Sequence, residues 1–427
     1  MLLSEARTQA PPAGRLLHRY RDVRARTLAL VAPLSAEDCA LQSMPDASPA
    51  KWHLAHTTWF FETFVVHPAR DGYRAFDPAF VVLFNSYYNA VGDKHPRPER
   101  GLLSRPALDV VMAYRAYVDE TMQACCERAA TDAALASLID LGLNHEQQHQ
   151  ELILTDILHL LSRNPLHPAY STPAPDAVRP VESCWIRYRA GLANVGHDGN
   201  GFAFDNEAPR HRVWLEPFEI ASRPVTNAEY AAFIDDGGYR RPELWLSMGG
   251  DWVQAGARKA PLYWRDDGGR WRIFTLQGEV DVDPHTPVCH LSYFEADAFA
   301  RWSGARLPTE LEWETAARSL AGPIAGNFVD RGAFHPLPQR EPLGDAPVQM
   351  FGDVWEWTQS AYLAYPGYRP LPGAVGEYNG KFMCSQFVLR GGSCATPPGH
   401  VRASYRNFFP PDAQWQFSGV RLARDAD

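Results

Sequence analysis

The sequence predicts an α+β multidomain protein, with a helical domain followed by an irregular domain rich in turns. Residues 15–162 contain few glycines and carry apolar residues at helical spacing, most clearly over 107–130. From Cys184 onward, short apolar and aromatic runs alternate with Gly-containing turns such as Asp267-Gly-Gly. A Pro-rich stretch between the halves breaks any helix and is typical of a linker. The expected boundaries are a first domain over 1–163, a linker over 164–183 and a second domain over 184–427.

Local signals place the helices in order along the chain. The segment 48–66 opens with Ser-Pro, a common helix start, and 107–130 follows with helical spacing of apolar residues. A third helix is predicted over 138–161. In the second half, only 226–235 and 293–301 show strong helical patterns, and no internal repeat is present.

Composition excludes several classes of protein. With 45% hydrophobic and 12% aromatic residues, the 427-residue chain can bury a substantial core, which excludes disorder over most of its length. Its formal net charge of -9 gives no reason to expect a nucleic-acid partner. No apolar run approaches the roughly 18 residues that span a bilayer, and the Arg-rich N-terminus lacks the apolar core of a secretory signal. We expect a cytoplasmic protein without nucleic-acid or membrane partners, whose seven cysteines are buried and reduced.

The most informative segment is the helix predicted over 138–161. His145 and His149 are spaced i, i+4, so both imidazoles leave the same helix face one turn apart. Two neutral imidazoles aimed at one interior point suit a divalent metal such as iron, zinc or nickel. The string HEQQH also matches the HExxH pattern of zinc peptidases, in which Glu146 would be the general base. A third interpretation is that the two histidines bind no metal and that their ring nitrogens form hydrogen bonds inside the core or to water at the surface.

A further metal-ligand candidate lies in the segment 48–62. His53 and His56 are spaced i, i+3 and flanked by aromatic residues, so one of them should face the same apolar interior. Two helices of a bundle can thus supply three imidazoles to one metal. Three histidines leave coordination positions open, which is the arrangement of a catalytic metal site.

Several long motifs resemble one enzyme family over nearly the whole chain and in the same order. The family is that of the ergothioneine-pathway sulfoxide synthases, non-haem iron enzymes also called hercynine oxygenases. It implies an N-terminal DinB-like four-helix bundle and a C-terminal formylglycine-generating-enzyme-like (C-type-lectin-like) domain. The motifs are WHLAHTTWFFE (52–62), NSYYNAVGDKHPRPERGLLSRP (85–106), NHEQQHQE (144–151), RLPTELEWE (306–314), GDVWEWT (352–358), VLRGGSC (388–394) and YRNFF (405–409).

The resemblance implies a metal, its ligands and a reaction. The ligands of Fe(II) would be His56, His145 and His149, with His53 a neighbour and Glu146 without its peptidase role. Such enzymes use O2 to join a thiol to the imidazole of N-alpha-trimethylhistidine (hercynine), producing a sulfoxide. The expected partners are therefore the small molecules hercynine, cysteine and O2, while the oligomeric state stays open.

The resemblance also implies roles for six further side chains, and three aromatic residues in or near the last motif are added to them because they could line the same pocket. Tyr87 and Tyr88 match an active-site tyrosine pair of the cysteine-using branch, and we prefer Tyr88 as the proton donor. Arg97 and Arg100 match a pair that holds the carboxylate of the thiol substrate, a task suited to guanidinium groups. The other substrate-binding candidates are Gln148, Asn407, Phe408, Phe409 and Trp415.

One departure from the family pattern bears on the thiol. Relatives that use gamma-glutamylcysteine carry Trp-Asp after this asparagine, whereas Phe408 and Phe409 follow Asn407 here. The missing acidic group favours free cysteine as the substrate. The alternatives are gamma-glutamylcysteine, a selenosugar donor for selenoneine synthesis and an ovothiol-type reaction on histidine, whose enzymes usually carry an added methyltransferase domain. From other classes, a zinc peptidase of HExxH type and a non-catalytic binding module stay open.

Overall fold

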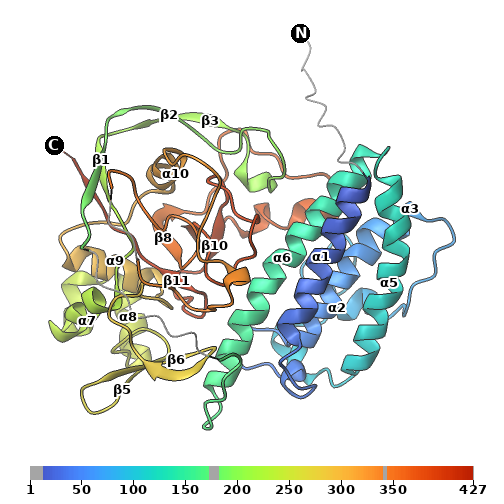
Figure 1. Ribbon diagram of the computed structural model, residues 1–427, viewed down its shortest axis with the longest axis horizontal. Coiled ribbons are helices and arrows are strands. Elements are labelled where there is room, and N and C mark those ends of the chain that lie inside the picture. Colours follow the sequence, from blue (N-terminus) through green and yellow to red (C-terminus); the bar gives the residue numbers. More distant parts are fainter. Residues whose placement is uncertain (1–12, 173–181, 340–343, 427) are drawn as a thin grey trace. The chain divides into compact units, whose positions relative to one another are not determined.

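The computed structural model describes residues 13–172, 182–339 and 344–426. In the described part, the chain divides into two compact units, which are drawn in Figure 1. The first unit comprises the described residues up to Leu160, together with two short later segments, Gly199–Phe202 and Leu371–Tyr378. The second unit comprises the remaining residues. Residues 173–181 of the predicted linker lie outside the described residues.

Four long helices make up most of the first unit (Figure 1). The predicted helices over 107–130 and 138–161 are present, and the segment 48–66 continues beyond its α-helix as a π-helical turn, Glu62–Val66. The long helices are α1 (Ala13–Val31), α2 (Ala50–Phe61), α5 (Leu108–Arg128) and α6 (Ala133–Ser162), and the short ones are α3 (His67–Ala69) and α4 (Phe80–Leu83).

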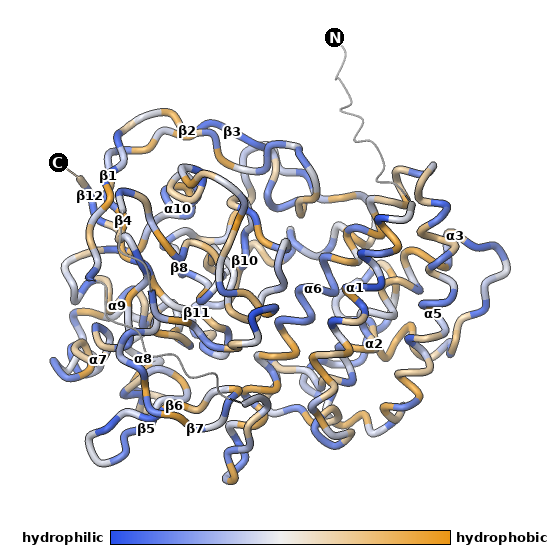
Figure 2. The backbone as a smooth tube through the Cα atoms, viewed as in Figure 1, coloured by the Kyte–Doolittle hydropathy of each residue, from blue (hydrophilic) through white to orange (hydrophobic). Residues whose placement is uncertain are grey.

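Hydrophobic side chains pack α2 closely against α6. Hydrophobic and hydrophilic stretches alternate along α1, α5 and α6 in Figure 2, as expected of amphipathic helices in a bundle. Trp59, Phe61 and Leu154 are fully buried. A Cβ atom at Gly142 would lie 2.6 Å from Cε1 of Phe61, so only glycine allows this approach. Because Gly142 lies one turn before His145, the close approach occurs beside the histidines of α6.

Short strands form four small sheets in the described part of the second unit. Most neighbouring strands are antiparallel, and only β11 pairs with β8 in parallel. The strand orders are β1-β4-β12, β10-β9-β8-β11, β2-β3 and β5-β6-β7. The strands are β1 (Trp185–Tyr188), β2 (Gly191–Val195), β3 (His211–Leu215), β4 (Phe218–Ala221), β5 (Trp264–Asp266), β6 (Trp271–Thr275), β7 (Gly278–Asp281), β8 (Trp355–Ala361), β9 (Phe387–Arg390), β10 (Asn407–Phe409), β11 (Ser418–Gly419) and β12 (Ala423–Asp425).

The second unit contains more helix than the sequence patterns predict. The predicted helices appear as α7 (Asn227–Asp235) and α9 (Tyr293–Trp302), and each begins with a capping box. Two further helices, α8 (Ser247–Gly256) and α10 (Glu310–Arg318), were not predicted. Both are short, α8 contains three glycines, and four of the nine residues of α10 are charged, so neither produces a strong apolar period.

Buried ion pairs fix the strand that carries several substrate-binding candidates. The Glu310 carboxylate accepts hydrogen bonds from Arg406 at 2.8 and 2.9 Å and from Arg390 at 2.9 Å. Arg390 ends β9 and Arg406 immediately precedes β10, so one carboxylate ties both strands to the first turn of α10. The three motifs that contain Glu310, Arg390 and Arg406 therefore have a structural role in the second unit.

Two observations bear on the expected environment of the protein. All seven cysteines are free, but Cys184 and Cys384 are exposed, so the prediction of buried thiols is correct for five of them only. Cys184 directly precedes β1 and Cys384 lies in a bend before β9, and composition gives no measure of exposure at such positions. Among the described residues, no helix combines the length and hydrophobicity needed to cross a membrane.

Candidate metal centre

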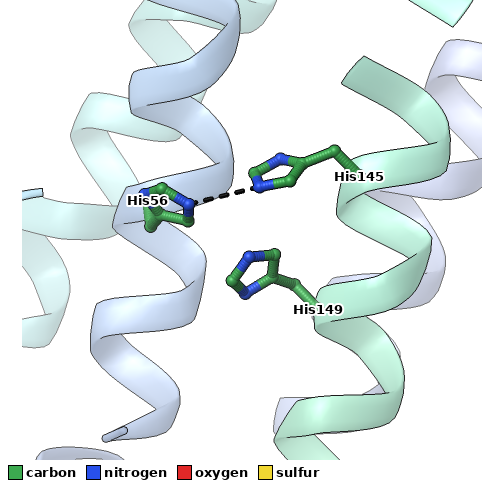
Figure 3. A group of neighbouring side chains, drawn as sticks. All are labelled: His56, His145 and His149. Carbon is green, nitrogen blue, oxygen red and sulfur yellow. Dashed lines mark hydrogen bonds between the residues drawn. The ribbon is translucent and has the colours of Figure 1, made fainter. Parts of the chain in front are cut away.

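Three imidazoles from two helices converge inside the first unit. One nitrogen from each of His56, His145 and His149 lies within 4.8 Å of the others. Figure 3 shows the rings pointing toward one another, His56 from α2 and the other two from successive turns of α6. The Nε2 atoms of His56 and His145 are 3.2 Å apart. Such a spacing of nitrogen lone pairs is what a shared metal ion requires.

Aromatic side chains hold the His56 ring in place. Trp52 and Trp59, one turn before and one turn after it on α2, stack on the imidazole with ring-centroid distances of 4.6 and 5.4 Å. Its Nδ1 atom donates a hydrogen bond to the carbonyl oxygen of Phe84 at 2.6 Å, which leaves Nε2 facing the other histidines. Phe60 of α2 stacks on the ring of His145 of α6 with a centroid distance of 4.6 Å.

Burial keeps the three imidazoles neutral. His56, His145 and His149 are 0%, 4% and 8% exposed. Loss of hydration lowers the pKa of His145 to about 3 and lowers the pKa values of His56 and His149 well below the ordinary range. The Nδ1 atom of His145 is buried and has no hydrogen-bond partner. Neutral imidazoles at neutral pH are the form that binds iron or zinc, so this donor set fits a divalent transition metal.

Glu146 is engaged away from the histidines by two buried arginines. Its carboxylate accepts hydrogen bonds from Arg24 at 3.0 Å, Arg115 at 2.9 Å and Thr27 at 2.7 Å. Burial opposes ionisation of the Glu146 carboxyl, but the charges of Arg24 and Arg115 outweigh it and lower the pKa to about 2. A carboxylate held so firmly in its charged form is a poor general base, so the geometry disfavours the peptidase interpretation.

The predicted tyrosines lie on the aromatic shell around His56. Tyr88 is 2% exposed, and its ring lies 5.6 Å from that of Trp59, which stacks on His56. The Tyr87 and Tyr88 rings are 4.7 Å apart, and the two side chains share a hydrogen bond. Burial raises the pKa of both phenols above the ordinary value. Both therefore stay protonated at neutral pH and can act as hydrogen-bond donors.

A residue from the second half of the sequence joins this group. Tyr378 belongs to the first unit and stacks on Tyr87 at a centroid distance of 5.3 Å, while its side chain hydrogen-bonds Gln148 of α6. The neighbouring Glu377 accepts hydrogen bonds from the backbone N–H groups of Asn89 and Ala90 at 3.0 and 2.8 Å. The sequence patterns did not predict Tyr378, because it lies in a turn-rich stretch far from the histidine motifs.

The structure separates the environments of the two predicted arginines. Arg100 is 5% exposed, stacks on Trp52 with its guanidinium carbon 3.4 Å from the ring centre, and donates to Ser48 Oγ at 2.9 Å. Its Nε atom is buried without a hydrogen-bond partner, and no carboxylate of the described residues forms an ion pair with it. Burial lowers the pKa of Arg100 to about 9, so it remains charged at neutral pH. Arg97 is exposed and donates to the backbone carbonyl of Asp46.

Comparison with known proteins assigns both parts of the chain. Residues 19–153 match the model of the DinB superfamily, and residues 171–341 and 341–426 match that of the sulfatase-modifying factor enzyme 1-like domain. A hercynine oxygenase of Mycolicibacterium thermoresistibile is 35% identical to this chain, over 98% of this chain and 96% of that protein. The chain belongs to the hercynine oxygenase family. The hercynine oxygenase of Mycobacterium tuberculosis is 37% identical over 94% of this chain and 96% of its own length.

Membership of the hercynine oxygenase family confirms two predictions. The protein is an enzyme, an oxidoreductase, and its fold class is the predicted DinB-like helical domain followed by a formylglycine-generating-enzyme-like domain. The second domain also resembles a wider group: a formylglycine-generating enzyme of Streptomyces coelicolor is 32% identical over 54% of this chain and 85% of that enzyme. The hercynine oxygenases, by contrast, match over both domains.

The remaining predicted site residues group together in the second unit of this hercynine oxygenase family member. Asn407, Phe408 and Phe409 form β10. Phe408 stacks on Tyr362 at a centroid distance of 4.0 Å, and Phe409 contacts the half-buried Trp415 edge-on at 6.1 Å. The three β10 residues are only partly buried, so they keep surface available for a ligand.

Proposed function

We propose that this enzyme joins hercynine to L-cysteine in an oxidative reaction that depends on Fe(II) and O2. The products are hercynylcysteine sulfoxide and water. The imidazole C–H and the thiol S–H bonds break, a C–S bond forms, one oxygen atom enters the sulfoxide and the other leaves as water. The observation that carries the proposal is the convergence of three buried, neutral imidazoles without a fourth protein ligand among the described residues.

The donor set favours a catalytic role for the bound metal. His56, His145 and His149 would hold Fe(II), and three protein ligands leave coordination positions for substrates. Fe(II), when bound there, would supply activation of O2 and coordination of the thiolate. The aromatic walls built by Trp52, Trp59 and Phe60 exclude water from the imidazoles, which strengthens electrostatic interactions inside the site.

The tyrosines would supply a proton near the metal. Tyr88 is our preferred donor because it packs on Trp59, next to His56, and its raised pKa keeps the phenol protonated. Tyr87 shares a hydrogen bond with Tyr88 and can replace a proton that Tyr88 gives up. Tyr378 orders Tyr87 by stacking and is hydrogen-bonded to Gln148, a candidate contact of hercynine.

Arg100 would bind the carboxylate of the thiol substrate. A buried guanidinium without an anionic partner is costly, and a substrate carboxylate would offset that cost through a charge-assisted hydrogen bond. We expect Arg100→Met to raise the KM for cysteine by about 10- to 100-fold, since hydrogen bonds to charged groups contribute roughly 1.5–3 kcal/mol. Steady-state kinetics with varied cysteine would measure this.

Two controls accompany the Arg100 prediction. Arg128→Met, which removes a surface arginine of α5, should leave the KM unchanged. Arg100→Lys keeps the charge but loses the planar fork, so an intermediate KM is expected. A KM for cysteine that is unaltered in Arg100→Met would exclude this role for Arg100.

The identity of the thiol is best tested by direct competition. The enzyme would receive hercynine with equal concentrations of cysteine, gamma-glutamylcysteine and a selenosugar, and the products would be identified by mass spectrometry. We expect hercynylcysteine sulfoxide to dominate, because Phe408 and Phe409 offer no acidic group for a gamma-glutamyl amine. A dominant gamma-glutamyl or selenium product would leave the family assignment intact and reject cysteine as the substrate.

A further inference from the structure

A hydrogen-bonded chain of side chains runs from the metal centre along α6. His149 Nδ1 lies 2.8 Å from Nδ1 of His53, and His53 Nε2 lies 3.0 Å from Oδ2 of Asp156. The same Asp156 oxygen accepts the backbone N–H of Ser48 at 2.8 Å. His53 and Asp156 are 2% and 6% exposed, so water does not compete for these bonds. We infer that Asp156 and His53 form a relay that fixes the ring orientation and tautomer of His149, so that its Nε2 faces the metal.

The donor and acceptor roles along this chain have one consistent assignment. Asp156 Oδ2 is an acceptor, so His53 Nε2 must carry the proton that lies between them. A neutral His53 then has an unprotonated Nδ1, which can only accept. His149 must therefore carry its proton on Nδ1, which leaves the Nε2 lone pair free. The opposite assignment would place two acceptors, His53 Nε2 and Asp156 Oδ2, 3.0 Å apart in a buried site.

The spacing on the two helices explains why the relay is possible. Asp156 follows His149 by seven residues, two turns along the same face of α6, and His53 precedes His56 by three residues on α2. Residues of α2 and α6 therefore alternate across the interface. His56 meets His145 at one level, and His53 lies between His149 and Asp156 at the next.

The relay makes His53 and Asp156 positioning residues of the metal centre. Partners that hold the second nitrogen of a metal-binding histidine orient the ring and strengthen its binding. His56 has such a partner in the Phe84 carbonyl and His149 has one in His53, whereas Nδ1 of His145 has none. The inference rests on the proposed metal site, to which it adds the residues that orient one ligand.

The first test measures metal affinity in the whole protein. Co(II) would be titrated anaerobically against a competing chelator for the wild type, Asp156→Asn and His53→Gln. We expect 10- to 100-fold weaker Co(II) binding in each variant. His159→Ala, which removes another α6 histidine hydrogen-bonded to Ser43, should bind Co(II) like the wild type. Circular dichroism of the metal-free variants would establish that they are folded, and either of the two relay variants is sufficient for the test.

The second test observes the protons themselves. In Zn(II)-loaded protein with 15N-labelled histidine, the His149 signals would be assigned by their absence from His149→Gln. We expect a protonated Nδ1 and a metal-bound Nε2 for His149. In Asp156→Asn, the protonated Nε2 signal of His53 should shift and its hydrogen exchange with water should accelerate, which a purely structural role of Asp156 would not produce.

The outcomes separate this inference from the proposed function. If the wild type and His56→Ala bind Co(II) equally well, the proposed metal site is wrong, whatever the relay variants do. If His56→Ala loses Co(II) but Asp156→Asn and His53→Gln keep wild-type affinity, the metal site stands and the relay is rejected. A His149 with its metal on Nδ1 would also reject the relay.

Discussion

Replacing His149 with alanine is expected to abolish iron binding and turnover while the helical unit stays folded. The substitution leaves two of three imidazoles, and it also leaves Nδ1 of His53 without its partner. Losing a direct ligand should weaken iron binding by more than the roughly 10- to 100-fold typical of losing an outer partner. The helix itself should survive, because alanine is the best helix former and Leu154 and Ile157 keep α6 anchored in the core.

The iron content after anaerobic reconstitution and the initial rate of O2 uptake would measure this effect, with circular dichroism to report the fold. His159→Ala is the matched control, because it removes an imidazole from the same helix outside the metal centre. Wild-type turnover with unchanged iron content in His149→Ala would show that the assigned ligands are wrong.

Replacing Glu146 with alanine is expected to destabilise the helical unit by about 3–5 kcal/mol, the usual cost of breaking a buried ion pair from one side. Arg24 and Arg115 are 4% and 2% exposed, and both would lose the carboxylate that neutralises them. Chemical denaturation followed by the helical signal would measure the change. Glu127→Ala, at an exposed position on α5, should change stability by no more than about 0.5 kcal/mol.

The same carboxylate gives stability a defined dependence on pH. Its pKa is about 2 in the folded protein, below the ordinary value of 4.5, so its contribution is complete above pH 4.5. It is lost as pH falls from about 4.5 to about 2, and amounts to roughly 3 kcal/mol. We expect Glu146→Gln to remove most of this acid dependence of the helical unit. An unchanged acid transition and unchanged stability would contradict the buried network.

The convergence of the three histidines could be predicted in part because the signal of two of them is local. His145 and His149 are one helical turn apart in the sequence, and that spacing survives in α6. His56 needed the resemblance to be preferred over His53, since both lie on one face of α2. The structure shows the difference: His56 Nε2 faces His145, whereas both nitrogens of His53 are engaged, by His149 and Asp156.

Other features of the site depend on contacts between distant parts of the chain. Tyr378 lies 230 residues after Gln148 in the sequence, and no periodic pattern connects them. Arg97 and Arg100 look alike in the sequence, but the 3-10 helix Arg97–Leu102 places one at the surface and the other against Trp52. Similarly, α10 was missed because it is a short, charged segment without a strong apolar period. Its buried Glu310 pairs with Arg390 at the end of β9 and with Arg406 just before β10.

We propose that the three histidines bind an iron ion that couples hercynine to cysteine with O2. The most direct measurement is product analysis after anaerobic loading with Fe(II) or, in parallel, with Zn(II), followed by hercynine, cysteine and O2. We predict hercynylcysteine sulfoxide only with Fe(II) and only when both substrates and O2 are present, with one O2 consumed per product. Equal product formation with Zn(II), or O2 uptake that does not require hercynine, would contradict this assignment of the iron site.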